Sequence, residues 1–130
     1  MGAVSATGVG MSTPLQGLRT VIYPVVNLTT SKEWWIQLLG QKPYFAEPFY
    51  VGFNVEGYEL GLLPGASQSD GAQVYWGVED VAEAVREAIV LGATELSPAT
   101  DVGEGIVTAT VRIPDGNVVG YIYNPNFTLR

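Results

Sequence analysis

Apolar and polar positions follow a pattern along the chain that occurs twice. The first occurrence opens at Leu18 to Val26, a run of β-branched and aromatic residues that predicts a strand. Apolar residues over 34–39 then recur at helical spacing, after a capping-box pattern at Thr30 to Glu33. Gly40 stands where a left-handed residue ends a helix. We therefore predict a strand followed by a helix of about three turns.

Short strands separated by turn residues come next. The alternation predicts strands over 43–46, 49–55 and 58–63. Glu56 and Gly57 are predicted to form a two-residue hairpin turn between the second and third of these strands. Residues 64–72 are polar and rich in glycine and serine, which indicates a flexible connection.

The same order then returns. A strand is predicted over 73–78, and Asp80 is placed to cap a helix that ends at Gly92. The apolar face of this helix consists of Val81, Val85, Ala88 and Ile89. A weak strand at 94–96 and a loop containing Pro98 precede two strands, 106–113 and 118–123.

This internal repeat is the most informative feature of the sequence. Thr20 to Tyr23 corresponds to Gln73 to Trp76, and Gly40 corresponds to Gly92. Each βαβββ unit is too small to bury its own sheet, so we predict one α+β domain over 17–130. Its modules, at about 17–64 and 72–125, form a curved, mostly antiparallel eight-stranded sheet around a cavity. The helices lie on the convex face, and residues 1–16 form a flexible N-terminal segment.

Composition excludes several classes of chemistry. The 130 residues include no cysteine and no histidine. This removes disulfides, thiol catalysis, Ser-His-Asp triads and histidine-ligated metals. A net charge of −7 argues against binding to nucleic acid. No apolar run approaches the roughly 20 residues that span a membrane, and no basic segment opens the chain as a secretory signal would. We therefore expect a cytoplasmic protein with no membrane partner.

The segment from Val21 to Pro43 resembles the opening of the vicinal oxygen chelate superfamily, which includes glyoxalase I, extradiol dioxygenases and bleomycin resistance proteins. The resemblance rests on four groups of residues and covers about residues 17–125. These are Asn27-Leu28 with Trp34-Trp35 and Leu39-Gly40, Gly57 to Leu62, Tyr75 to Val85, and Ile113 to Pro125. It implies a sheet that encloses a cavity, and a homodimer, with which the aromatic residues over 44–53 are compatible.

The resemblance also implies four metal-ligand positions, here Thr20, Glu59, Gln73 and Gly120. Only Glu59 and Gln73 carry plausible ligand atoms, and both supply oxygen. The site is thus a degenerate one. We expect no tightly bound cofactor, and at most a divalent cation that Glu59 and Gln73 bind weakly.

Strand alternation gives the side chains that line the cavity. Glu59 faces away from Leu60 and Leu62, which belong to the core. The remaining residues on the cavity side are predicted to bind the ligand, namely Thr20, Ile22, Gln73, Tyr75 and Ile122. A carboxylate in such a place is a candidate general base, or an anchor for a cationic or hydroxylated ligand. The alternative is a structural relic that is hydrogen-bonded to Gln73, Thr20 or water.

Three functions remain open at this point. The first is a metal-independent protein that binds a small organic molecule in an apolar cavity, as bleomycin resistance proteins do. The second is a divalent-metal-dependent lyase or isomerase of the glyoxalase type, or a dioxygenase-related enzyme, with Glu59 as the base. The third is a structural or regulatory partner that keeps only the fold. The sequence leaves open whether the protein is an enzyme.

Overall fold

The computed structural model describes residues 13–67, 69 and 71–127. Most of the predicted flexible segment, residues 1–12, lies outside the described residues. The strands have the order β2-β3-β4-β1-β5-β8-β7-β6 in an eight-stranded mixed sheet, and the two helices complete an α+β fold, which confirms the predicted architecture. The described chain divides into an N-terminal unit, residues 18–75 with 126 and 127, and a C-terminal unit, residues 76–125 with the segment before 18.

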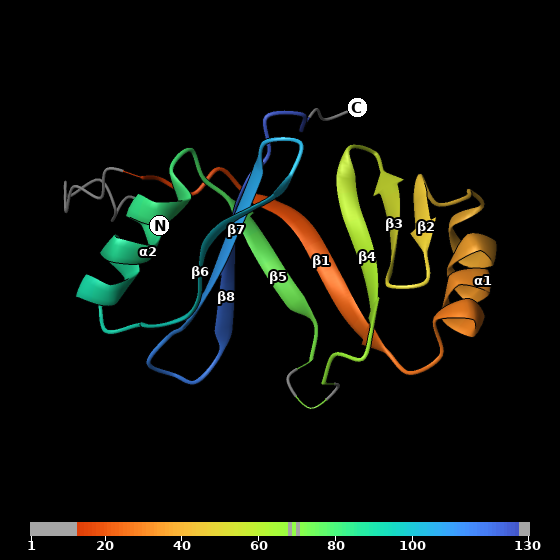
Figure 1. The fold of residues 1–130 in the computed structure, drawn as a ribbon, viewed down its shortest axis with the longest axis horizontal. Coiled ribbons are helices and arrows are strands. Elements are labelled where there is room, and N and C mark those ends of the chain that lie inside the picture. The colour runs from red at the N-terminus through yellow and green to blue at the C-terminus, as the bar shows by residue number, and fades with distance from the viewer. Residues whose placement is uncertain (1–12, 68, 70, 128–130) are drawn as a thin grey trace, which may run out of the picture. The chain divides into compact units, whose positions relative to one another are not determined.

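The N-terminal unit has one helix and a sheet of mixed direction (Figure 1). Its elements are β1 (Leu18–Val25), α1 (Leu28–Leu39), β2 (Phe45–Glu47), β3 (Tyr50–Val55) and β4 (Tyr58–Pro64), and β5 (Gln73–Gly77) begins in it. Strand β4 pairs in parallel with β1 and antiparallel with β3. The predicted hairpin turn between β3 and β4 is confirmed, because Glu56 and Gly57 have positive φ angles of 55° and 99°. Such angles at both central residues are typical of a two-residue hairpin turn.

Helix α1 begins earlier than the capping-box pattern indicates. Its N-cap is Asn27, whose side-chain oxygen accepts a hydrogen bond from the Thr30 amide at 2.9 Å. The predicted cap at Thr30 is wrong, because Asn27 satisfies this first-turn amide one turn earlier. The end of the helix is as predicted, since Gly40 has a φ of 69°. This is the left-handed conformation that commonly ends a helix.

The core of the N-terminal unit lies between α1 and the sheet. Its buried members are Val25, Val51, Phe53, Leu60 and Leu62. Trp35 packs against them and stacks on Tyr23, with ring centroids 5.7 Å apart, whereas Trp34 is 56% exposed. One tryptophan of the pair thus belongs to the helix–sheet contact, as expected for an amphipathic helix.

The C-terminal unit buries its helix more completely. It contains α2 (Val81–Val90), β6 (Thr94–Gly103), β7 (Ile106–Arg112) and β8 (Val118–Tyr123). Asp80 caps α2 as predicted, by accepting a hydrogen bond from the Glu83 amide at 3.0 Å. Val81, Ala84, Val85 and Ala88 are buried. Ile89, predicted on the same face, is 45% exposed, because it comes in the last turn of the helix.

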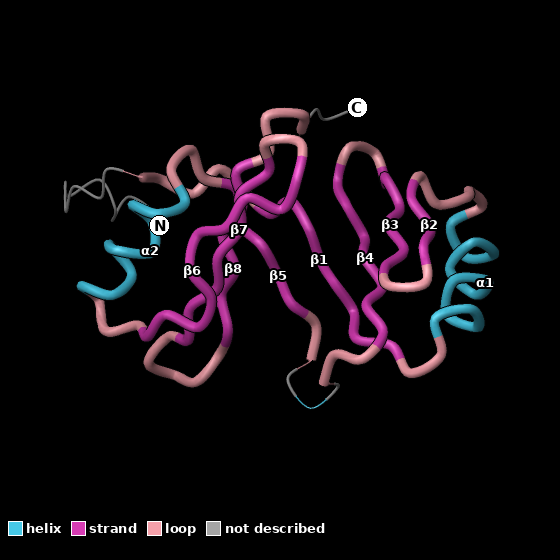
Figure 2. The backbone as a smooth tube through the Cα atoms, in the orientation of Figure 1, coloured by secondary structure: helices cyan, strands magenta, loops and turns pink. Residues whose placement is uncertain are grey.

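The predicted loop after residue 96 is wrong. Strand β6 continues to Gly103, and Figure 2 shows it as one of the strands beside β7. The two strands pair through register shifts at Glu95/Ser97, Ser97/Thr100 and Asp101/Gly103. Proline and glycine are tolerated there because β6 is an edge strand interrupted by irregularities. No helix among the described residues is long and apolar enough to cross a membrane.

Candidate functional site

The alternation of β4 separates a carboxylate from the core. Leu60 and Leu62 are buried with the side chains under α1, so Glu59 lies on the opposite face of the sheet. The pairing register places Glu59 between Thr20 of β1 and Asn54 of β3. The β4 sequence therefore presents one half-buried acidic group on the face that no helix of this unit covers.

Two tyrosines hold this carboxylate. The hydroxyl of Tyr50 donates a hydrogen bond to Glu59 Oε2 at 2.7 Å, and the hydroxyl of Tyr44 donates to the same oxygen at 2.9 Å. Hydrogen bonds to a charged acceptor are stronger than neutral ones, so the two phenols stabilise the ionised carboxylate. We call these three residues the tyrosine–glutamate cluster. Strand alternation alone did not predict that either ring reaches Glu59.

Paired glycines make room for the cluster. Gly52 of β3 and Gly61 of β4 stand directly opposite each other. A Cβ atom at Gly61 would lie 2.7 Å from Cζ of Tyr50, and one at Gly52 would lie 2.9 Å from Glu59 Oε2 and 3.0 Å from the Tyr44 ring. These distances are shorter than van der Waals contact, so the tyrosine rings depend on the absence of side chains at the two glycines.

The protonation of Tyr50 is tied to Glu59. Burial raises the pKa of the Tyr50 hydroxyl far above its ordinary value of 10.0, and the charge and hydrogen bond of Glu59 raise it further. The charges of Tyr44 and Tyr75 contribute smaller increases to the pKa of Tyr50. Burial likewise raises the pKa of Tyr75. Both phenols are therefore neutral hydrogen-bond donors throughout the physiological pH range.

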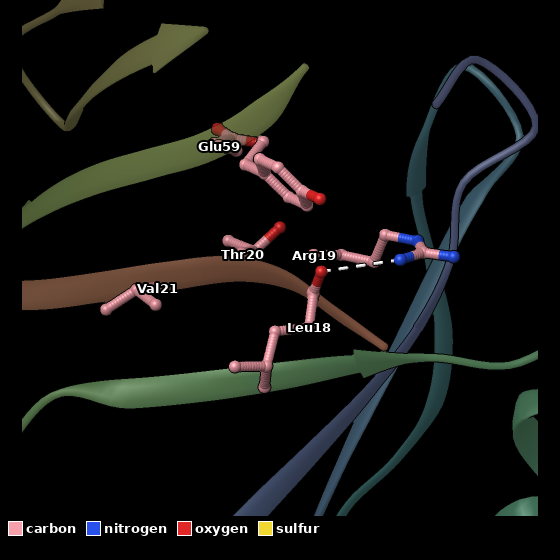
Figure 3. A pocket seen from close by; sticks show the side chains of 6 residues that line it. Leu18, Arg19, Thr20, Val21 and Glu59 are labelled. Carbon is pink, nitrogen blue, oxygen red and sulfur yellow. Dashed lines mark hydrogen bonds between the residues drawn. The ribbon is translucent and has the colours of Figure 1, made fainter. Parts of the chain in front are cut away.

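A pocket of about 390 Å³ lies beside Glu59. Six residues at the beginning of the parallel strands β1 and β4 line it, namely Leu18, Arg19, Thr20, Val21, Tyr58 and Glu59 (Figure 3). Its volume falls within the range of roughly 300–1,000 Å³ that is typical of sites for small organic molecules. The wall is mainly apolar, and the acidic group in it is Glu59.

Arg19 lines the pocket but is directed elsewhere. Its guanidinium lies 4.0 Å from the centre of the Phe127 ring and donates a hydrogen bond to the Leu18 carbonyl at 3.3 Å. Figure 3 shows the Arg19 side chain extending away from the Glu59 carboxylate. Phe127 also contacts Tyr58, with ring centroids 5.8 Å apart, so a C-terminal residue borders the pocket. Sequence reasoning found neither Arg19 nor Phe127. A strand pattern reports local alternation, and it does not show that Phe127 contacts Arg19 and Tyr58, which are far from it in the sequence.

The predicted ligand-binding residues occupy different places. Thr20 is 6% exposed and lines the pocket with Glu59, and Ile22 follows on the same face of β1, opposite Gly61. The Tyr75 hydroxyl donates to Gln73 Oε1 at 3.2 Å, and neither residue lines this pocket.

Ile122 belongs to the C-terminal unit. It is 6% exposed on β8, opposite Thr108 of β7. Its neighbours Tyr121 and Tyr123 pack against the core under α2, so Ile122 lies on the face away from that helix. The structure thus places Thr20 and Glu59 together, and it places Ile122 in the other unit.

The donor atoms present do not fit a tightly held metal. Within the described residues, no group of three or more His, Cys, Asp or Glu side chains is placed to hold an ion. Glu59 Oε2 already accepts two hydrogen bonds, and Gln73 Oε1 accepts one. Catalytic metal sites usually need three protein ligands. The remaining candidate, Thr20, supplies only a neutral hydroxyl.

No protein-family model matches this chain, and no curated protein matches it. Solved structures do. Methylmalonyl-CoA epimerase from Streptomyces coelicolor, in complex with 2-nitronate-propionyl-CoA, superimposes with a TM-score of 0.70 at 13% identity, over 86% of this chain and 99% of that one. A glyoxalase/bleomycin resistance protein/dioxygenase superfamily member from Vibrio splendidus has a TM-score of 0.61 at 16% identity, over 82% and 99% of the two chains.

A third similar structure carries a different activity in its name. It is the NAD-dependent benzaldehyde dehydrogenase from Legionella pneumophila, with a TM-score of 0.62, 21% identity, and coverage of 80% of this chain and 96% of that one. Such low identities show the fold alone. The chain has the fold of the vicinal oxygen chelate superfamily, which confirms the resemblance found in the sequence. One fold hosts many activities, so the chemistry depends on the site.

Proposed function

We propose that this protein binds a small organic molecule in the pocket at the beginning of β1 and β4, with Glu59 as its polar anchor and without a catalytic metal. The observation that carries the proposal is the double role of Glu59, which lines the pocket and is held in place by two phenols. A fixed polar group in an apolar wall orients a ligand whose body fills the cavity.

The apolar part of the wall supports binding of a hydrophobic body. Leu18, Val21 and Tyr58 supply this surface, and Thr20 adds a hydroxyl beside the carboxylate. Covering such surface stabilises a complex by roughly 25 cal/mol per Å² before the costs of association. A ligand with a few apolar carbon atoms and one polar group fits this arrangement.

Nuclear magnetic resonance of the full chain tests the proposal. We expect some members of a small-molecule library to shift the backbone amides of residues 18–21, 58 and 59 in a saturable way. Leu18→Trp fills the pocket and abolishes these shifts. Leu15→Trp is the matched control, because Leu15 is 52% exposed, close to the 46% of Leu18, and does not line the pocket. Equal binding by both variants, or a library without effect on these amides, contradicts the proposal.

The second candidate is a lyase or isomerase that uses Glu59 as a base. The likeness to methylmalonyl-CoA epimerase favours it, because that protein's name denotes an isomerase on a similar fold. Both phenols donate to Oε2, so the lone pairs of Glu59 Oε1 are available to accept a proton from a substrate. Exchange of solvent deuterium into the carbon beside a carbonyl, in a panel of thioesters and 2-oxo compounds, distinguishes this candidate. Exchange that Glu59→Gln abolishes establishes it.

We propose weak binding of a divalent cation at most, through Glu59 and Gln73. Metal analysis of the purified protein tests this expectation. Stoichiometric metal that is lost in Glu59→Gln contradicts it, and favours a metal-dependent enzyme. Retention of full ligand binding in the presence of a chelator supports the metal-independent proposal.

We also propose a homodimer that uses the aromatic residues around β2. Tyr44, Phe45 and Phe49 are 62%, 38% and 64% exposed, and β2 is an edge strand of only three residues. Exposed apolar patches on an unpaired edge are typical of interfaces. Sedimentation of the full chain and of Phe49→Ser measures the oligomeric state. A wild-type chain that sediments as a monomer contradicts the proposal.

A further inference from the structure

Within the part of the chain that the structure describes, the charge of Glu59 has no cationic partner. Among the described residues, no Lys or Arg forms an ion pair with Glu59, and its hydrogen-bond partners are the neutral hydroxyls of Tyr44 and Tyr50. Arg19, in the same pocket wall, lies over Phe127 instead. A half-buried carboxylate that has no cation beside it is stabilised when a cation binds to it.

The geometry of the tyrosine–glutamate cluster leaves one carboxylate oxygen available. Both phenols donate to Oε2, and no donor from the described part of the chain reaches Oε1. An ionised carboxylate is acceptor-only, so the group that binds Oε1 must supply a proton donor. The cluster therefore selects for N–H or O–H groups and against other acceptors.

Aromatic rings next to the carboxylate add a preference for positive charge. The rings of Tyr44 and Tyr50 each lie near Phe45, with centroids 6.4 Å and 6.2 Å apart, and Phe45 also contacts Phe49 at 6.0 Å. Phe45 is paired with Gly52, so it lies on the same face as the cluster. The faces of aromatic rings attract cations, and they attract ammonium groups most when water is partly excluded.

Net charge acts in the same direction at long range. The chain carries six basic and thirteen acidic residues, which gives −7 at neutral pH. A negative field increases the rate at which cations meet the protein and decreases it for anions. The carboxylate, the aromatic side chains around it and the net charge thus all favour a positively charged ligand.

From these observations we infer that the ligand is an organic ammonium compound: a protonated amine on an apolar body. Its N–H groups bind Oε1 of Glu59 beside the rings of Tyr44 and Tyr50, and its body occupies the pocket lined by Leu18 and Val21. The inference rests on the proposed function, because it names the ligand class of the same pocket.

Three small probes of similar shape test which ligand charge the pocket prefers. Benzylammonium, benzyl alcohol and benzoate share a ring and differ in the polar group, and each is titrated into the full chain while the amides of residues 18–21, 58 and 59 are followed. We expect benzylammonium to bind at least about tenfold more tightly than the alcohol, because its full positive charge adds attraction to the hydrogen bond that both probes donate to the carboxylate. Benzoate should bind least.

Variants then assign the effect to Glu59. Glu59→Gln keeps the shape and removes the charge, so it should remove the preference for benzylammonium. Glu95→Gln changes the net charge equally at an exposed position of β6 and should leave the preference intact. Should Glu59→Gln fail to fold, Glu59→Ala removes the same charge. The preference for benzylammonium over benzyl alcohol should be lost in that variant as well.

The outcomes distinguish failure of the ammonium inference from failure of the proposed function. If alcohol or benzoate binds as tightly as benzylammonium, or if Glu59→Gln keeps the preference, the ammonium inference is overturned. The proposed function still stands in that case, provided that Leu18→Trp abolishes binding. If no probe shifts the pocket amides, the inference is overturned as well, and the library experiment alone then decides the proposed function.

Discussion

The two units have the same order of elements but differ on the face of the sheet that lies away from the helix. In the N-terminal unit, the β3–β4 hairpin places Gly52 opposite Gly61, and tyrosine rings lie over this pair. In the C-terminal unit, the β7–β8 hairpin places Thr108 opposite Ile122, and both carry branched side chains. At these two pairs of positions, the N-terminal unit thus leaves room for tyrosine rings, whereas the C-terminal unit carries side chains of its own.

The helices also differ, in how many of their residues are buried. Helix α2 buries four residues against its sheet, whereas no residue of α1 is fully buried. The largest fully buried side chain of the N-terminal unit, Phe53, comes from strand β3 and not from the helix. A duplicated unit therefore need not share its tasks equally. Here the C-terminal unit packs its helix tightly, and the N-terminal unit carries the candidate site.

Adding a methyl group to one of the paired glycines should have the strongest effect. A Cβ at Gly61 meets Cζ of the Tyr50 ring at 2.7 Å. Gly61→Ala should therefore decrease the free energy of unfolding by about 3 kcal/mol, the upper end of overpacking effects. Urea unfolding measures this decrease. In a Tyr50→Val background the same Gly61→Ala change should cost much less than in the wild type, because the obstructing ring is gone. An equal cost of Gly61→Ala in both backgrounds would show that the glycine serves the backbone and not the ring.

Removal of one hydroxyl tests the cluster more gently. The Tyr50 hydroxyl donates to the Glu59 carboxylate. Tyr50→Phe should decrease stability by about 1.5–3 kcal/mol near pH 7, the range for hydrogen bonds to charged groups. Urea unfolding at that pH measures the loss. Tyr23→Phe is the control, because Tyr23 is 40% exposed and stacks on Trp35, which is not part of the tyrosine–glutamate cluster.

The pH dependence of this variant has a definite sign. The pKa of Tyr50 is raised in the folded state by burial and by Glu59. The folded chain therefore keeps a proton that the unfolded chain releases above about pH 10. The contribution of Tyr50 to the free energy of unfolding is therefore fully present below about pH 10, and it decreases as the pH rises above that value. The stability difference between wild type and Tyr50→Phe should shrink between about pH 9 and about pH 11. A constant difference, measured by urea unfolding at both values, contradicts the assignment.

A smaller effect distinguishes the two helices. Val85 on α2 is 5% exposed, whereas Leu38 on α1 is 60% exposed. Val85→Ala should decrease stability by about 1.5 kcal/mol, because it removes two buried carbon groups of about 0.8 kcal/mol each. Leu38→Ala should change stability by less than about 0.5 kcal/mol, as is usual for surface substitutions. Thermal unfolding of both variants tests the unequal burial. Equal decreases would mean that α1 is covered in solution by a surface that the isolated chain does not show.

Sequence patterns predicted much of this fold because they report local physics. Alternation placed Glu59 and Leu60 on opposite faces of the sheet, and the residue types of Glu56 and Gly57 predicted the turn. Strand β6 was missed beyond residue 96, because Pro98 and Gly103 signal a loop wherever pairing with a neighbour is unknown. Sequence patterns thus succeed where the stabilising interaction is local, as in most caps and turns. They fail for an irregular edge strand, because that strand depends on pairing with a distant partner.

The candidate site was only partly predictable for the same reason. Glu59 and Thr20 were found from strand faces, and they line one pocket. The hydrogen bonds of Tyr44 and Tyr50 depend on rings that lie over glycines of two paired strands, which no local pattern reports. A glycine pair in register, with tyrosines nearby on the same face, is the signal that would have found them.

The smallest difference lies at the helix starts, where the two units use different caps for one task. Asn27 and Asp80 each accept a hydrogen bond from an amide three residues later, at 2.9 and 3.0 Å. Replacement of either residue by Ala should cost about 1 kcal/mol. Asp80→Ala should cost a few tenths more, because its negative charge also interacts with the positive end of the helix dipole. Urea unfolding in low salt and in about 1 M salt separates the two contributions, because salt at that level screens surface charges. The excess for Asp80 should vanish in high salt, whereas the shared part should remain. An excess that survives high salt would assign the difference to packing around Asp80 and not to its charge.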